Sequence, residues 1–165
     1  EAERSTIMLD PPRQKVKEDE MKVAETYVQM KERHQKEVNE FPMMWAFNND
    51  QFAQGMKKLG LQETDTDKIY RIAPGGFIRK TDADKLNEMF TRHTKERKEA
   101  MAADIDGTGY LFQMFRYELA NHEYSYTEDA EETLDALGLT YGDVNSSPAM
   151  RAALNAAIKV VCNDD

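Results

Sequence analysis

The stretch of sequence that decides the fold class is Lys68-Ile69-Tyr70-Arg71-Ile72-Ala73-Pro74-Gly75-Gly76-Phe77-Ile78-Arg79. Its first half alternates apolar and polar side chains, as does a strand with one face against a core. The Pro-Gly-Gly segment then reverses the chain, because proline fixes φ and glycine accepts backbone angles that other residues avoid. We therefore predict an antiparallel hairpin over residues 68–79.

The segments around the hairpin predict one more strand and about six helices. The short aromatic run 43–47 follows a proline and favours a third strand. Apolar residues at spacings of three, four and seven predict the helices. The first helix has roughly 25 residues, starts near Pro11 and carries Val16, Val23 and Val38. The others cover about 49–59, 82–103, 110–122, 128–137 and 148–161.

These elements predict an α+β fold that is mostly helical, with about six helices and a small antiparallel sheet. A chain of 165 residues is long enough for one core. We expect residues 1–39 to form an N-terminal extension with the long amphipathic helix, and residues 40–165 to form a single α+β domain. We identify no internal repeat.

Charge is distributed unevenly along the chain. Residues 1–103 hold nineteen acidic and nineteen basic side chains, whereas residues 104–165 hold twelve acidic and three basic ones. The last third therefore carries the whole net charge of −9. An acidic surface repels phosphate backbones and attracts a basic protein groove, so we expect no direct binding of nucleic acid. A solvated acidic face that only keeps the helices soluble is the alternative.

The sequence shows neither a membrane span nor a secretory signal, and Cys162 is the only cysteine. A membrane span requires about 18 to 20 apolar residues, and no stretch approaches that length. We therefore expect a cytoplasmic protein without an internal disulfide.

The strongest local motif is Asp104-x-Asp106-Gly107-Thr108-Gly109, which matches the start of an EF-hand calcium loop. That loop requires a glutamate at its twelfth position, where this chain has Phe115. We interpret the segment as a capped turn between two helices and expect no metal site.

No catalytic constellation is evident either. Glu118 and His122 lie four residues apart on one helix, but the second histidine of a zinc-protease motif is replaced by Tyr126. We therefore expect no enzymatic activity and no cofactor. A metal-dependent enzyme that uses Asp104, Asp106, Glu118 and His122 remains the weakest alternative.

Four segments carry a resemblance to a known family. They are Phe41-Pro42-Met43-Met44-Trp45-Ala46-Phe47, the hairpin 69–80, the segment 115–124 and Leu134-Asp135-Ala136-Leu137-Gly138-Leu139. Over about residues 40–158 the chain resembles an uncharacterised family of small proteins from phages and mobile elements of anaerobic gut bacteria. The resemblance implies a context in which small accessory proteins counter host defences, including CRISPR effectors. It implies no catalytic residues.

Charge and resemblance together lead to one functional hypothesis. We expect an inhibitor of a host nucleic-acid-handling machine, of the anti-CRISPR kind (a Cas9-type effector is favoured) or the anti-restriction kind, which binds by mimicking nucleic acid. The expected partner-binding residues are Glu118, Glu123, Tyr124, Tyr126, Glu128, Asp129, Glu131, Glu132 and Asp135. The alternative is an assembly protein that forms a homo-oligomer through residues 16–38.

Overall fold

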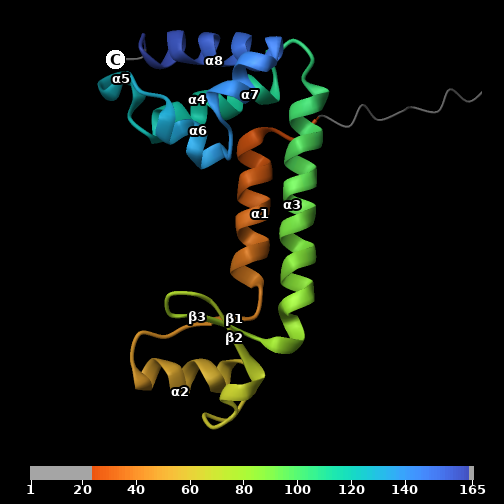
Figure 1. Cartoon of the computed structure of the whole chain (residues 1–165), viewed down its shortest axis with the longest axis vertical. Helices are drawn as coiled ribbons and strands as arrows, with labels where there is room; N and C mark the ends of the chain where they lie inside the picture. The colour runs from red at the N-terminus through yellow and green to blue at the C-terminus, as the bar shows by residue number, and fades with distance from the viewer. Residues whose placement is uncertain (1–23, 164–165) are drawn as a thin grey trace, which may run out of the picture.

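The computed structural model describes residues 24–163 (Figure 1). The α-helices are α1 (Tyr27–Glu40), α2 (Asn49–Lys58), α3 (Ala83–Ala103), α4 (Tyr110–Asn121), α5 (Tyr124–Thr127), α6 (Glu131–Leu137), α7 (Tyr141–Ser146) and α8 (Pro148–Val161). The strands are β1 (Met43–Trp45), β2 (Ile69–Ala73) and β3 (Gly76–Arg79), with short 3-10 turns at Thr66–Lys68 and Lys80–Asp82. The predicted mostly helical α+β class is confirmed.

The sheet is antiparallel, with the strand order β1-β3-β2. The hairpin and the third strand predicted from the sequence are both present, although β1 ends at Trp45 and not at residue 47. The strand ends early because Asn48 begins the next helix: its side-chain oxygen accepts a hydrogen bond from the Gln51 N–H at 2.8 Å.

Two separate apolar cores lie at opposite ends of the molecule, joined by the α1–α3 column (Figure 1). The smaller core packs β1 and β3 against α2 around Met44 and Met56. The larger core packs α4 against α6, α7 and α8 around Leu119, Leu134 and Ala157. Helix α1 adds Tyr27 and Met30 to this larger core.

The long first helix predicted from Pro11 is wrong at residues 24–26, which are not helical. Helix α1 begins at Tyr27 because Thr26 and Gln29 form a capping box, in which each side chain accepts a hydrogen bond from the other residue's backbone N–H. Val16 and Val23 lie outside the described residues. The part of the prediction that runs to Val38 is confirmed.

The acidic helix predicted over 128–137 is wrong at its start. Glu128 has a left-handed backbone with φ of 53°, and Asp129 accepts a hydrogen bond from the Glu131 N–H at 2.9 Å, so α6 begins at Glu131. Helices α5 and α7 are additional, which raises the predicted six helices to eight between residues 24 and 163. The capping box of Thr140 and Asp143 explains α7 and was available in the sequence.

Helices α1 and α3 run antiparallel (Figure 1). They are joined by a reciprocal network of charged side chains, here named the histidine clasp. Its members are Arg33, His34 and Glu37 of α1 and Arg92, His93 and Glu96 of α3. The Nε2 atoms of His34 and His93 each lie 2.8 Å from the glutamate of the opposite helix. Each glutamate also accepts hydrogen bonds from both arginines. The two imidazole rings stack with centroids 3.8 Å apart.

The clasp arises from a short sequence repeat. Residues 30–40 and 89–99 both follow the pattern Met-x-x-Arg-His-x-Lys-Glu-x-x-Glu. In an antiparallel pair, two copies of one helical motif place the glutamate of each opposite the histidine of the other. Our expectation of no internal repeat is therefore wrong. The repeat is hard to detect in the sequence because the flanking residues differ, whereas the contacts between the helices make it evident.

The clasp makes folding dependent on pH. Hydrogen bonds from Arg92 and His93 lower the pKa of Glu37 to about 2, and those from His34 and Arg33 lower the pKa of Glu96 to about 2. Burial lowers the pKa of His34 below its usual 6.5. All three groups bind protons more weakly in the folded state. Their contribution to the free energy of unfolding is therefore complete above pH 6.5 and decreases as the pH falls, first through His34 and then, from pH 4.5 towards 2, through the carboxylates.

Replacing one carboxylate of the clasp tests this contribution. We expect Glu37→Gln to lower the free energy of unfolding at pH 7 by about 1–2 kcal/mol, because charge-assisted hydrogen bonds are lost from a half-exposed site. The difference from wild type should vanish near pH 2. Urea denaturation over a pH series measures both effects. Glu32→Gln on the exposed side of α1 is the matched control, and an equal cost for the two variants would contradict the role of the clasp.

The loop from α3 to α4 is a turn capped by its own carboxylates. Asp104 Oδ2 accepts hydrogen bonds from the backbone N–H groups of Gly109 at 3.1 Å and Leu111 at 2.8 Å. Gly107 has φ of 74° and lies so close to α8 that a Cβ here would overlap the Ala149 carbonyl oxygen. The capped turn predicted from the sequence is confirmed, and it fixes where α8 crosses the loop.

Gly107→Ala should lower the free energy of unfolding by roughly 2–3 kcal/mol, since it combines a strained φ with a backbone clash. Gly138→Ala is the control, because Gly138 has φ of 66° but no atom near its missing Cβ, so only the backbone strain of about 1 kcal/mol applies. Thermal unfolding of both variants measures the difference. Equal losses would show that α8 can move away from the loop.

Candidate partner-binding surface

Six carboxylates predicted to bind a partner lie exposed on α6 and on the turns that flank α5. They are Glu123, Glu128, Asp129, Glu131, Glu132 and Asp135. Among residues 24–163, the only ion pair that involves one of them joins Glu132 to His122 Nδ1 at 3.7 Å. The sequence has no lysine or arginine between Arg116 and Arg151. These six side chains, here named the acidic face, therefore carry negative charge that no lysine or arginine within the described residues neutralises.

Local backbone structure explains why these carboxylates point outward. Helix α6 directs Thr133 and Leu134 into the core, which leaves the charged positions of its other side in solvent. Glu123 and Glu128 both have positive φ, so the chain turns sharply before and after α5. Both glutamates are accordingly exposed.

Glu118, which was predicted to belong to this surface, is buried instead. Its side chain is only 3% exposed; it accepts a hydrogen bond from the Tyr27 hydroxyl at 2.6 Å and pairs with Lys31. Burial alone would raise the pKa of Glu118, but the hydrogen bonds from Lys31 and Tyr27 bring it below the usual value. Glu118 therefore joins α4 to α1 and is unavailable to a partner. The position of Glu118 on the apolar side of α4 is the sequence signal for its burial. Its negative charge alone suggests an exposed side chain.

The two predicted tyrosines differ in accessibility. Tyr126 is 81% exposed, whereas Tyr124 is half-buried against the larger core, and burial raises its pKa. Tyr117 of α4 is partly exposed beside Tyr27, and Lys31 Nζ lies 4.7 Å from its ring centroid. Tyr126 is thus the aromatic side chain most available to a partner.

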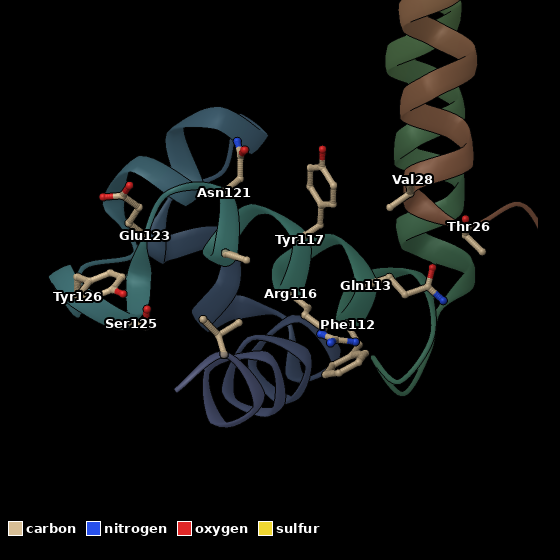
Figure 2. A pocket seen from close by; sticks show the side chains of 12 residues that line it. Thr26, Val28, Phe112, Gln113, Arg116, Tyr117, Asn121, Glu123, Ser125 and Tyr126 are labelled. Atoms are coloured by element: carbon tan, nitrogen blue, oxygen red, sulfur yellow. The ribbon is translucent and has the colours of Figure 1, made fainter. Parts of the chain in front are cut away.

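A groove adjoins the acidic face and is shown in Figure 2. It has a volume of about 810 Å³ and extends from the start of α1 along α4 to α5. Its lining residues are Thr26, Val28, Phe112, Gln113, Arg116, Tyr117, Ala120, Asn121, Glu123, Ser125, Tyr126 and Val161. The acidic face and the groove share Glu123, and Tyr126 of the groove lies between Glu123 and Glu128 along the chain, so a partner could contact both surfaces together. The groove is not evident from the sequence because its walls come from α1, α4, α5 and α8.

The described residues offer no arrangement that suggests metal chemistry. Between residues 24 and 163, no group of three or more histidine, cysteine or acidic side chains could hold a metal ion. Glu118 and His122, considered above as an acid-base pair, lie 3.7 Å apart within the polar contacts that join α4 to α1. None of the helices in this part of the chain combines the length and apolar character that crossing a bilayer requires.

A charge-removing substitution distinguishes the buried glutamate from the exposed ones. Glu118→Ala should lower the free energy of unfolding by about 2 kcal/mol, because the Tyr27 hydroxyl loses its acceptor and Lys31 its partner. Glu123→Ala should change it by less than about 0.5 kcal/mol. Chemical denaturation checks both values. A small loss for Glu118→Ala would restore that residue as a candidate for partner binding.

Comparison with known proteins defines a family. Neither the curated proteins nor the solved structures give a match. One family model does match, over residues 26–160, from the cap of α1 through nearly all of α8. The chain belongs to this family, which is described as a family of unknown function (DUF7659).

Proposed function

We propose that this protein is a non-enzymatic inhibitor that binds the nucleic-acid groove of a partner protein through its acidic face. The observation that carries the proposal is the exposure of six carboxylates without lysine or arginine partners among residues 24–163. A groove that neutralises phosphates presents lysine and arginine at close spacing. Carboxylates that their own chain leaves unpaired can occupy such a groove in place of phosphates.

The neighbouring groove supplies the apolar part of the same interface. Protein interfaces derive most of their affinity from a few aromatic or arginine side chains at the centre, with charged residues around them. Tyr126 projects beside the groove, and the walls add Val28 and Phe112 (Figure 2). The fitting partner segment is therefore basic, with one or two apolar side chains that enter the groove.

The cellular context extends the proposal. The resemblance to proteins of phages and mobile elements favours a defence machine of the host as the target, with a Cas9-type CRISPR effector ahead of a restriction enzyme. Such an inhibitor would act in the cytoplasm. The alternative, assembly through residues 16–38, has weaker support, since Tyr27 and Met30 lie in the larger core and the remaining apolar positions before residue 24 lie outside the described residues.

Charge reversal tests the acidic face. The variant Glu128→Lys, Asp129→Lys, Glu131→Lys and Glu132→Lys should lose inhibition of DNA cleavage by a purified Cas9-type effector, and wild-type inhibition should weaken as salt rises from 50 to 300 mM, since screening shortens the range of charge interactions. The measurement is the fraction of target DNA cleaved against inhibitor concentration. Circular dichroism confirms that the variant is folded.

The matched control reverses the same number of charges elsewhere. Glu32, Glu63, Asp84 and Glu88 are exposed and have no ion pair within the described part of the chain, so their replacement by lysine produces the same net charge. This control should inhibit as wild type does. If both quadruple variants lose inhibition equally, net charge matters and the acidic face does not. If wild type fails to inhibit any effector or restriction enzyme, the proposed target class is wrong.

A further inference from the structure

The sheet end of the molecule carries an exposed apolar patch that the acidic face does not explain. Trp45 is 53%, Phe47 74%, Tyr70 50% and Ile72 40% exposed. Met44 pairs with Phe77 on the side of the sheet that packs against α2. Side chains alternate along a strand, so Trp45 and Tyr70 lie on the opposite side. We name these four residues the aromatic patch.

Two glycines allow the rings to lie across the hairpin. A side chain at Gly76 would meet both the Trp45 ring and Ile72, which therefore flank this position. The Phe47 ring lies against Gly75, where a Cβ would overlap it. The patch is thus continuous over the β2–β3 turn, which extends away from the α1–α3 column (Figure 1).

A cation lies beside the aromatic patch. Lys80 Nζ lies 5.1 Å from the centroid of the Tyr70 ring. Arg71 is also exposed, but it pairs with Phe77 and therefore lies on the other side of the sheet. Lys68, by contrast, is paired with Asp65 at 2.9 Å. Residues 41–80 hold six basic and four acidic side chains, so this end of an acidic protein has a positive balance.

We propose that the aromatic patch binds single-stranded nucleic acid, with bases stacked on Trp45 and Phe47 and phosphates beside Lys80. Flat rings that stand in solvent on a sheet, with cations next to them, form the kind of surface on which unpaired bases stack. An acidic protein segment would pair with the cation alone, whereas unpaired bases also stack on the ring faces. Paired bases within a duplex cannot reach the rings, and only the base pair at each end of a duplex could stack on them.

The charge of the chain does not prevent this binding. Helix α3 has 21 residues and is therefore about 30 Å long, and Figure 1 shows the sheet and the helices α4–α8 toward opposite ends of the column that it forms with α1. The Debye length at physiological salt is about 8 Å, which screens the repulsion between a strand on the patch and the distant carboxylates. The expectation that the chain binds no nucleic acid rests on its acidic last third, and residues 41–80 have the opposite charge balance. The inference is independent of the proposed inhibition.

The chain contains one tryptophan, so Trp45 reports on the patch directly. Addition of a 15-nucleotide oligothymidylate to the full chain at 50 mM salt should quench its fluorescence in a saturable manner, and the apparent Kd should rise with salt. Phe47→Ala should weaken binding about tenfold, because one stacked base is lost. Phe47 is exposed, so this variant should keep its circular dichroism spectrum. Lys80→Gln should weaken binding and reduce the salt dependence.

Tyr141→Ala is the matched control, because Tyr141 is as exposed as Tyr70 but belongs to α7, at the other end of the molecule. It should bind the oligonucleotide as wild type does. Absence of quenching, equal quenching by a blunt duplex of the same length, or equal losses in Phe47→Ala and Tyr141→Ala would each overturn the inference. If light scattering shows an oligomer that Phe47→Ala dissociates while the oligonucleotide has no effect, the patch is instead an interface between copies of this chain.

Discussion

The arrangement of the whole molecule depends on the contact between α1 and α3. Neither apolar core extends along the column, so the two helices are held midway by the histidine clasp. Its hydrogen bonds are directional, and each of its six side chains contacts a partner on the other helix or a ring stacked between the helices. A shift of either helix by one turn would mismatch every pair. The clasp therefore specifies one register, which packing of interchangeable apolar residues would specify less strictly.

The column also separates surfaces of opposite character. One end carries the acidic face beside an apolar groove, and the other carries aromatic rings with a lysine beside them. The overall composition does not show this difference between the two ends. The net charge of −9 is a sum over the whole chain and describes neither end by itself. Each surface is made of side chains that the fold itself does not need. Glu118 illustrates the reverse case: a charged residue in the acidic third that the fold uses internally.

Sequence patterns predicted the helices and strands better than the contacts between them. The hairpin, the third strand and the helices α2, α3, α4 and α8 follow from local periodicity and capping, so a single sequence sufficed. The start of α6 was wrong because a left-handed Glu128 has no reliable local signal. The exposed carboxylates of α6 could be predicted from helical periodicity. The groove and the clasp could not, since both bring together residues from helices distant in sequence, and the burial of Glu118 depends on Tyr27, 91 residues away.

The length of α3 has a consequence for the spacing of the two ends of the molecule. A helix of 21 residues is about 30 Å long, and the sheet and the helices α4–α8 lie toward opposite ends of its column with α1 (Figure 1). A flexible tether of the same contour length would sample many separations. The paired helices select one, so the side chains exposed at one end keep a fixed spacing from those at the other.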